Sequence, residues 1–301
     1  MEINMNRHAY LIIAHHQFSL LEKLIRLLDN ERNDIYIHID KKVKNFDEQP
    51  FYKAVKYSKI YFVKRIAVSW GAFSQIKCEM ELLKSAVSGS YQYYHLISGA
   101  DLPLKKQSEI HNFFEKNNGC EYVQFDSETV DNNVFERLKF YYPFQEYYVS
   151  KGKIVRFIAN KLLGIQKRLK INRLRKSNLV LQKGPNWFSI THELAQYILS
   201  CDKQINTMFK WTSCCDEVFV QTIVANSKFK NNLYFNGEED NQLGCIRYID
   251  WKRGYPYIFR KGDYDQLIGS PFFFARKFDI DVDSEIIERL FTTLMEKEAK
   301  I

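Results

Sequence analysis

The sequence predicts an α/β protein with a mostly parallel central sheet and helices on both faces. Short continuous apolar runs such as 9–14 and 35–39 are typical of strands buried on both sides. Between these runs lie segments whose apolar residues recur at helical spacing. A hydrophobic content of 46% excludes a disordered chain, and 301 residues are enough for a substantial core.

The alternation begins with a strand at 9–14, a helix up to Asn30 and a strand at 35–39. Ser19, followed three residues later by Glu22, has the pattern of a capping box and predicts where that helix begins. Further helices are expected near 49–57, 72–86 and 108–114, with strands at 59–63, 93–97 and 121–125. From 126 to 150 the periodicity fades, and we expect a loop-rich region beside a cleft.

The C-terminal part continues the pattern. Strands are expected at 187–190, at 246–251 and within 272–278, helices at 192–199 and 217–225, and a last helix after 279–283. The helix at 217–225 opens with the adjacent acids Asp216 and Glu217. Carboxylates are favoured at a helix N-terminus, so one of the two can cap the helix, and the other is then free for chemistry.

The positive charge of the chain is local. Of a net charge of +8, ten Lys and Arg residues and no acid lie between Lys151 and Lys176. Apolar residues interleave with these charges, as in a basic amphipathic helix that lies on an anionic membrane surface. A solvated helical face packed on the domain explains the pattern equally well. Nucleic-acid binding is less favoured, because no nucleic-acid motif accompanies the charge.

The six cysteines form no CxxC pair and no zinc-type spacing, which favours reduced and mostly buried thiols. The adjacent Cys214 and Cys215 leave a redox or metal role open. No apolar stretch approaches the roughly 18 residues of a membrane span, and the first residues lack the apolar region of a signal peptide. We therefore expect a cytoplasmic protein.

Four polar residues follow directly on predicted strands: His15, Asp40, Arg65 and Asp101. The carboxyl ends of parallel strands share one edge of a sheet, and ligands bind in the crevice outside that edge. Each residue has an ordinary explanation as a turn, cap or surface charge, but their coincidence at strand ends favours a site. No G-x-G-x-x-G follows the first strand, so a dinucleotide site is disfavoured.

A second candidate is the aromatic segment 272–278, which carries the consecutive cations Arg276 and Lys277. It predicts either an edge strand with solvated tips or a strand that brings positive charge to a diphosphate. The Asp-x-Asp patterns within 279–283 follow this strand and are expected to begin the last helix rather than to hold a metal. The loop after the strand at 93–97 offers the single acid Asp101.

Taken in order along nearly the whole chain, eight motifs resemble the core-2/I-branching β-1,6-N-acetylglucosaminyltransferase family, which also contains peptide O-xylosyltransferases. They are Ala9-Tyr10 through His15-His16, Tyr36-x-His38-x-Asp40-x-Lys42, Arg65-x4-Trp70-Gly71, Ser98-Gly99-x-Asp101-x-Pro103-x-Lys105, Trp187-Phe188-Ser189, Asp216-Glu217 with Gln221-Thr222, Arg247-Tyr248-Ile249-Asp250-Trp251, and Phe273-Phe274-Ala275-Arg276-Lys277-Phe278-Asp279. The resemblance implies a GT-A type glycosyltransferase fold, inversion at the anomeric carbon, a UDP-sugar donor and no metal or other cofactor.

The same resemblance assigns roles to residues. Glu217 would be the general base that takes the proton from the acceptor hydroxyl, with Asp216 its nearest rival. Asp40 and Arg65 would hold the uridine part, with His15 and Asp101 beside the donor. Arg276 and Lys277 would replace the metal at the diphosphate. The substrate-side aromatics would be Trp70, Trp187 and Trp251.

One domain over 1–301 is expected, with a nucleotide-binding half (1–125), a loop-rich and basic amphipathic segment (126–182) and an acceptor and catalytic half (183–301). The disulfides and membrane-anchored stem of secreted animal members have no counterpart in the sequence, which points to a bacterial-type cytoplasmic enzyme, peripheral on the inner face of a membrane. We expect transfer of N-acetylglucosamine from its UDP-sugar to a glycan or lipid-linked acceptor in cell-surface polysaccharide synthesis. Xylosyl transfer, and an inactive carbohydrate- or membrane-binding protein on the same fold, remain alternatives.

Overall fold

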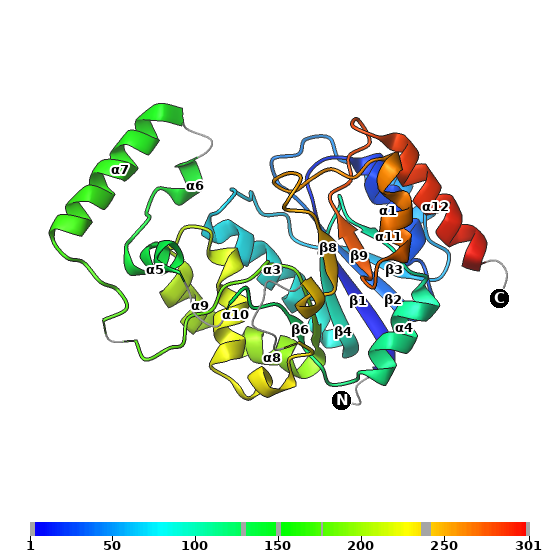
Figure 1. Ribbon diagram of the computed structural model, residues 1–301, viewed down its shortest axis with the longest axis horizontal. Helices are drawn as coiled ribbons and strands as arrows, with labels where there is room; N and C mark the ends of the chain where they lie inside the picture. The colour runs from blue at the N-terminus through cyan, green and yellow to red at the C-terminus, as the bar shows by residue number, and fades with distance from the viewer. Residues whose placement is uncertain (1–3, 128–130, 149–151, 176, 236–241, 299–301) are drawn as a thin grey trace.

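The computed structural model describes residues 4–127, 131–148, 152–175, 177–235 and 242–298, and shows an α/β protein (Figure 1). Its strands are β1 (Asn4–Ala14), β2 (Asn33–Ile39), β3 (Lys59–Phe62), β4 (Tyr91–Ser98), β5 (Leu102–Pro103), β6 (Tyr122–Val123), β7 (Phe188–Thr191), β8 (Arg247–Ile249) and β9 (Phe274–Arg276). Its α-helices are α1 (Phe18–Leu28), α2 (Gln49–Lys53), α3 (Phe73–Ala86), α4 (Gln107–Lys116), α5 (Asn132–Lys139), α6 (Gln145–Tyr148), α7 (Gly152–Arg168), α8 (His192–Ser200), α9 (Asp202–Phe209), α10 (Phe219–Ala225), α11 (Tyr264–Gly269) and α12 (Ser284–Glu298).

Six strands form the main sheet in the order β3-β2-β1-β4-β7-β6. The four consecutive neighbours from β3 to β4 are parallel, whereas β7 runs antiparallel to both β4 and β6. The predicted mostly parallel sheet is therefore confirmed. The chain builds β1, β2 and β3 in one direction and then returns to place β4 on the other side of β1, so the strand order reverses between β1 and β4.

Alternate residues of β1 enter two separate cores, as the two-residue period of a strand requires. Tyr10 and Ile12 pack with α1, α4, α11 and α12, whereas Ala9 and Leu11 pack with α3, α8 and α10. Figure 1 shows these two helical layers on opposite sides of the sheet. The prediction of helices on both faces is confirmed.

A second, three-stranded sheet in the order β5-β9-β8 adjoins the main one. The fully buried Arg247 of β8 joins the two sheets by donating hydrogen bonds to the carbonyl oxygens of Phe188 at 2.7 Å and Leu96 at 3.3 Å. Its guanidinium also lies over the ring of Phe274 in β9, 4.7 Å from the centroid. Arg247 thus fixes β9, the cationic strand, relative to β4 and β7.

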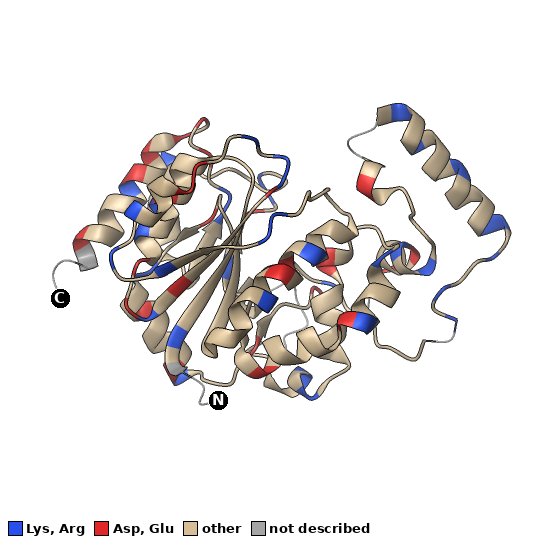
Figure 2. Ribbon diagram, turned by 180° about the vertical axis from the view of Figure 1, so that it is seen from behind, with Lys and Arg blue, Asp and Glu red and all other residues tan. Residues whose placement is uncertain are grey.

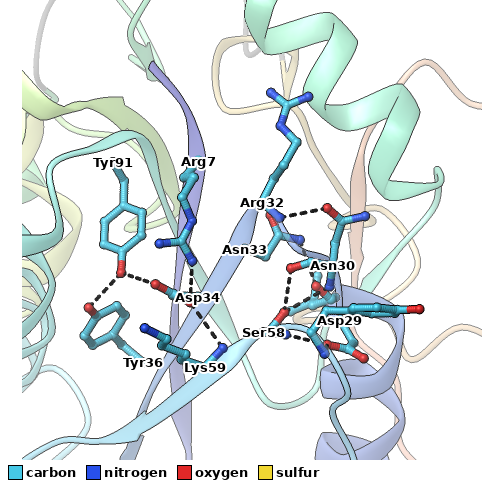
Figure 3. Close-up of polar contacts among 12 residues, drawn as sticks. Arg7, Asp29, Asn30, Arg32, Asn33, Asp34, Tyr36, Ser58, Lys59 and Tyr91 are labelled. Carbon is cyan, nitrogen blue, oxygen red and sulfur yellow. Dashed lines mark hydrogen bonds and ion pairs between the residues drawn. The ribbon is translucent and has the colours of Figure 1, made fainter. Parts of the chain in front are cut away.

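The amino-terminal edge of the main sheet is closed by a buried polar network around Asp34 (Figure 3). Its carboxylate pairs with Arg7 at 2.7 Å, accepts a hydrogen bond from the Tyr91 hydroxyl at 2.5 Å and accepts another from the Lys59 backbone at 3.2 Å. Tyr36 completes the network through its hydroxyl contact with Tyr91. These contacts tie β2, β3 and β4 together at the edge opposite the predicted site.

Three local predictions are wrong. The predicted capping box at Ser19 and Glu22 does not form, because α1 begins at Phe18 with Gln17 in the left-handed region (φ 58°) and no side-chain cap. The Gln17 side chain instead donates to Asp279 Oδ1 at 2.8 Å and accepts from the Ile280 backbone at 3.1 Å. The region 126–150, expected to be loop-rich, contains α5 and α6, and α9 has no counterpart among the predicted helices.

The basic segment forms the predicted helix only as far as Arg168, because α7 spans Gly152–Arg168 and residues 169–175 are not helical. Its end residues Lys151 and Lys176 lie outside the described residues. All six cysteines are free thiols, and four of them are buried, as expected. In the described part of the chain, no helix is long and apolar enough to span a membrane.

Candidate active site

His15, Asp40 and Asp101 lie near the reversal of strand order between β1 and β4, at the carboxyl ends of their strands. The loop after β4 is held to β1 by a hydrogen bond from the Gly99 N–H to the Ile13 carbonyl at 2.9 Å. A Cβ atom at Gly99 would lie 2.9 Å from that of Ala14, so the two loops approach as closely as they do because this position is glycine. The carboxyl ends of β1 and β4 thus form the kind of edge where open α/β sheets bind ligands.

His15 and Asp40 lie at this edge, at the ends of β1 and β2. The Asp40 N–H donates to the Ala14 carbonyl at 3.0 Å, which brings the two loops together. Partial burial lowers the pKa of His15, and Lys277 and Lys42 lower it further against the opposing charge of Asp40. The imidazole of His15 is therefore neutral at pH 7 and able to accept as well as donate a hydrogen bond.

Arg65 is committed to the protein backbone. Its guanidinium donates to the carbonyl oxygens of Ile39 at 3.2 Å and Asp40 at 2.8 Å, and it also bonds that of Val43. In this position it fixes the loop that carries Asp40. Direct contact of Arg65 with a uridine stays a prediction.

The cationic strand lies against the loop after β4. Arg276 Nε is 3.5 Å from Asp101 Oδ1, and the guanidinium stacks on the Trp187 ring at 4.1 Å from its centroid. Asp101 itself is buried and accepts hydrogen bonds from both the backbone N–H and the hydroxyl of Ser98. Asp101 and Trp187 therefore position Arg276 and leave its terminal nitrogens as donors.

Lys277 is half-buried beside Arg276, and among the described residues no carboxylate pairs with its ammonium group. Burial lowers the pKa values of His15 and His16, and the charge of Lys277 lowers both further. Two adjacent cations at the reversal point, with one acid that is already hydrogen-bonded, make a site suited to an anion such as a diphosphate.

The two adjacent acids occupy a 3-10 turn (Cys215–Glu217) that precedes α10. Neither caps that helix, which begins at Phe219 without a side-chain cap. The expectation that one acid caps the helix is therefore wrong. The turn is held instead by a hydrogen bond from the Cys214 N–H to the Gly71 carbonyl at 2.8 Å.

Asp216 and Glu217 lie in different environments. Asp216 is buried and accepts a hydrogen bond from Gln75 Nε2 of α3 at 2.8 Å, and its other oxygen has no partner. Burial, with the neighbouring charge of Glu217, raises the pKa of Asp216 to about 7. The side chain of Glu217 is 38% exposed, and its Oε2 lies 3.2 Å from Arg137 Nη1 of α5. Of the two carboxylates, that of Glu217 is the one a substrate can reach.

The segment Gly184–Trp187 connects the acids to the cationic strand. The Gly184 N–H donates to the Glu217 carbonyl at 2.9 Å. Three residues later, the ring of Trp187 stacks against the Arg276 guanidinium. Three extended residues span at most about 11 Å. A Cβ at Gly184 would lie 2.0 Å from the Gln124 carbonyl oxygen, so only glycine fits this passage. An acid and a cation are thus held at the two ends of one short segment.

The three predicted aromatic residues differ in accessibility. Trp70 is 68% exposed and Trp251 50%, whereas Trp187 is only 7% exposed and is covered by Arg276. Trp70 and Trp251 have free ring faces that a sugar can stack on. Trp187 supports the guanidinium instead, and its predicted contact with a sugar stays untested.

The Asp-x-Asp patterns at 279–283 are used within the protein. Asp283 Oδ1 accepts a hydrogen bond from the Ile286 N–H in the first turn of α12, and Asp279 and Asp281 accept from Gln17. Two hollows of the described surface also lie elsewhere. One is lined by Gln92 and Asn118 and another by residues of α3 and α9, and neither includes a predicted site residue.

The sequence analysis missed Glu79, a second buried acid beside the turn Cys215–Glu217. It lies one helical turn after Gln75 on α3, is fully buried, and neither of its oxygens accepts a hydrogen bond of normal geometry. Burial and the charge of Asp216 raise the pKa of Glu79 well above its usual value, against a weaker opposing effect of Asn186. An acid on the apolar face of a predicted helix is the signal that would have marked it.

We expect Glu79→Gln to stabilise the protein more at pH 8 than at pH 5. The folded state keeps the proton that the unfolded state loses near pH 4.5, so Glu79 lowers stability increasingly as the pH rises above that value. The gain in unfolding free energy from the substitution should therefore grow steadily between pH 5 and pH 8. Urea unfolding of the variant and the wild type at pH 5 and pH 8 measures the difference in their unfolding free energies. The buried histidines contribute equally to the two proteins, so their titration cancels in that difference.

The matched control for this prediction is Glu81→Gln, a partly exposed acid two residues further along α3. It should change the unfolding free energy by no more than about 0.5 kcal/mol at either pH. An equal loss of stability for Glu79→Gln at pH 5 and pH 8 would show that Glu79 is ionised in the folded protein.

Comparison with known proteins adds an independent finding. The family model described as "Branch: Core-2/I-Branching enzyme" matches residues 8–266. Xylosyltransferase 2 of Canis lupus familiaris is 24% identical over 94% of this chain, but the chain spans only 33% of that protein. The human β-1,3-galactosyl-O-glycosyl-glycoprotein β-1,6-N-acetylglucosaminyltransferase is also 24% identical, over 96% of this chain and 70% of its own length.

Among solved structures, mouse xyloside xylosyltransferase 1 in its apo form aligns with 89% of this chain and 96% of its own, at a TM-score of 0.37 and 10% identity. Core-mannan synthase A of Aspergillus fumigatus aligns with 74% of this chain and 71% of its own, at a TM-score of 0.38 and 11% identity. Likenesses of this size carry no argument about the site.

Proposed function

The chain belongs to the Core-2/I-Branching enzyme family of glycosyltransferases, and we propose that it transfers a sugar from a UDP-sugar to a glycan or lipid-linked acceptor, with inversion and without a metal. The observation that carries this proposal is that the short segment Gly184–Trp187 links the accessible Glu217 to the strand of Arg276 and Lys277. Its first residue bonds the Glu217 backbone, and its last residue supports the Arg276 guanidinium. A base at one end and a cationic pair at the other are what a single displacement at a sugar carbon needs.

In the proposed reaction Glu217 takes the proton of the acceptor hydroxyl while the hydroxyl oxygen attacks the anomeric carbon of the donor sugar. The bond from that carbon to the β-phosphate oxygen breaks, and its electron pair leaves with UDP. Arg276 and Lys277 neutralise the charge that grows on the diphosphate. One displacement without a covalent enzyme intermediate inverts the anomeric configuration. Arg137, 3.2 Å from Glu217, orients the carboxylate between turnovers.

On the donor side, we propose that His15 and Asp40 contact the nucleoside and that Arg65 holds their loop. Trp70 and Trp251 are proposed as stacking surfaces for the transferred sugar and the acceptor, because both rings are exposed. The arrangement needs no divalent cation at the diphosphate, since two fixed cations supply the charge that a metal would bring.

We propose N-acetylglucosamine as the transferred sugar, supported by the human β-1,6-N-acetylglucosaminyltransferase, whose length the chain spans far more fully than that of xylosyltransferase 2. Xylose is the second candidate, because the xylosyltransferases are equally similar in sequence. We place the reaction on the cytoplasmic side of a membrane, in the synthesis of a cell-surface polysaccharide. An inactive binding protein is disfavoured by the accessible Glu217 and by the adjacent cations Arg276 and Lys277.

Release of UDP from a panel of UDP-sugars, measured in EDTA and again with added Mn²⁺, tests the proposal. We expect UDP-N-acetylglucosamine to be turned over, with a rate in EDTA within about twofold of that with the metal, because Arg276 and Lys277 already neutralise the diphosphate. If only UDP-xylose were turned over, the donor would be UDP-xylose and the proposed mechanism would still hold. Strict dependence on Mn²⁺ would refute the role of the cations, and no turnover of any UDP-sugar would favour the inactive protein.

A further inference from the structure

Helix α7 stands apart from the rest of the molecule. It lies at one end of the long axis of the protein, next to α6 and far from both sheets (Figure 1). Only one of its residues, Gln166, is buried. Helices that contribute nothing to a core but keep a regular apolar pattern usually cover something else.

The outward face of α7 is apolar. Its exposed apolar side chains, together with that of Leu169 just beyond the helix, range from 46% exposed at Ile158 to 74% at Ile154. They are Ile154, Phe157, Ile158, Ile165 and Leu169. Spacings of three, four, seven and eleven residues place these side chains on one side of a helix. Val155 and Leu162, which are only partly exposed, mark the side turned towards the protein.

The same helix is strongly basic. The segment 152–175 carries Lys153, Arg156, Lys161, Lys167, Arg168, Lys170, Arg173 and Arg175, and it contains no acid. In Figure 2 the positive residues are distributed along the whole of α7. Lys161 and Arg168 lie four and eleven residues after Phe157, on the same face as the exposed apolar side chains. Long basic side chains within an apolar face can extend to lipid phosphates while their stems stay in the apolar layer.

Helix α7 is held in place at its C-terminal end. The Gln166 side chain both accepts from the Tyr141 N–H at 2.8 Å and donates to the Tyr141 carbonyl at 2.9 Å. Just beyond the helix, Arg173 donates to the carbonyl oxygens of Phe140 at 3.0 Å and Met208 at 2.6 Å. Phe140 and Tyr141 follow directly on α5, the helix whose Arg137 contacts Glu217, whereas Met208 belongs to α9. The orientation of α7 is therefore linked to the acceptor side of the site.

We propose that the outward face of α7 docks the enzyme on an anionic phospholipid membrane, and that the acceptor is a lipid-linked glycan presented to Glu217 from that surface. The first part stands on the helix alone, whereas the second rests on the proposed transferase function. An apolar face that carries Lys161 and Arg168 and no acid matches the two layers of an anionic bilayer, an acyl region and a negative headgroup plane.

A second copy of the chain is the competing occupant. Two α7 helices meeting through their outward faces would bring Lys161 and Arg168 of each close to the same cations of the other, which is unfavourable in a low dielectric. An anionic lipid surface instead attracts Lys161 and Arg168, so docking there brings no like charges together. Charge complementarity thus favours lipid over self-association.

Flotation of the full chain with vesicles tests the docking. We expect binding to vesicles of phosphatidylcholine and phosphatidylglycerol in equal parts, and at least about tenfold weaker binding to phosphatidylcholine alone or at high salt. The double variant Phe157→Glu/Ile158→Glu should weaken vesicle binding by at least about tenfold, because it places two negative charges in the apolar arc. Tyr57→Glu, at an equally exposed aromatic remote from α7, is the matched control and should bind as the wild type does.

Two further readouts separate the possible failures. UDP release in solution should be unchanged in the double variant, since its residues lie outside the site. A loss of UDP release would contradict the separation of docking from catalysis. Equal binding of wild type and double variant to the anionic vesicles would overturn the docking proposal, and so would a wild-type dimer in light scattering that the double variant converts to a monomer. Inactivity on every UDP-sugar with normal flotation would instead refute the transferase proposal alone.

Discussion

Replacing Glu217 by Gln is expected to lower the rate of sugar transfer by about 10² to 10⁴ while leaving the affinity for UDP nearly unchanged. The amide keeps the size of the side chain and can still accept a hydrogen bond from Arg137, but it cannot take a proton. The rate is measured with donor and acceptor at saturation, and the affinity for UDP by calorimetry. Glu193→Gln, at an exposed acid on α8, is the control and should be fully active.

The neighbouring acid provides the decisive contrast. Asp216→Asn can keep the hydrogen bond from Gln75, because the Asn carbonyl oxygen accepts it. A neutral side chain also suits a buried site where the pKa of Asp216 is already raised to about 7. We therefore expect this variant to retain at least about a tenth of wild-type activity. The opposite order, an active Glu217→Gln and a dead Asp216→Asn, would make Asp216 the base.

Replacing Arg276 by Ala is expected to weaken UDP binding by about 10- to 100-fold, the effect of losing a charge-assisted contact worth about 1.5–3 kcal/mol. Uridine, which lacks the diphosphate, should bind the variant and the wild type equally well. Arg276→Lys should recover only part of the affinity, because an ammonium cannot reproduce the planar stack on Trp187. Calorimetry with UDP and with uridine measures both effects.

The chain offers a matched control for this substitution. Arg289 of α12 also stacks on an aromatic ring, Tyr264, at 3.6 Å from its centroid, and also has an acid, Asp265, within 3.8 Å. It lies on the layer of helices remote from the site, so Arg289→Ala should bind UDP normally. An equal loss of affinity for UDP and for uridine in Arg276→Ala would mean that Arg276 supports the fold of the pocket and not the diphosphate.

Much of the fold followed from the sequence because a parallel sheet leaves a strong pattern. The runs at 9–14 and 35–39 are apolar throughout, since β1 and β2 are buried on both faces. Elements without such a pattern were missed. Strand β5 has two residues, and α9 buries only Ile205 and Phe209, too few to give a helical period. The start of α1 depended on Gln17 reaching Asp279, a contact between residues far apart in the chain.

The positions of the candidate site residues could be predicted from the sequence, but their contacts could not. His15, Asp40, Arg65 and Asp101 were found because the ends of parallel strands share one edge, whatever the rest of the fold. The contacts that each of these side chains makes could not be predicted, because they depend on partners that are distant in sequence. Arg65 holds a loop, Asp101 holds Arg276, and the exposure that distinguishes Glu217 from Asp216 is set by α3 and α5.

The predicted division at 1–125, 126–182 and 183–301 stays a prediction. Strand β7, from the third segment, pairs with β4 and β6 from the first, so the outer segments share one sheet. Arg247 strengthens that union by hydrogen-bonding to both β4 and β7. The outer segments are therefore neighbouring parts of one framework, which we expect to keep Glu217 and the cations of β9 at a fixed separation.

Proton NMR of the anomeric hydrogen during turnover in EDTA provides the sharpest test of inverting, metal-independent transfer. Starting from an α-linked UDP-sugar and an acceptor that the wild type uses, we expect a β-linked product to form at the rate at which the donor signal is lost. With Glu217→Gln, the donor signal should persist. An α-linked product, or product formation that begins only when Mn²⁺ is added, would contradict the mechanism.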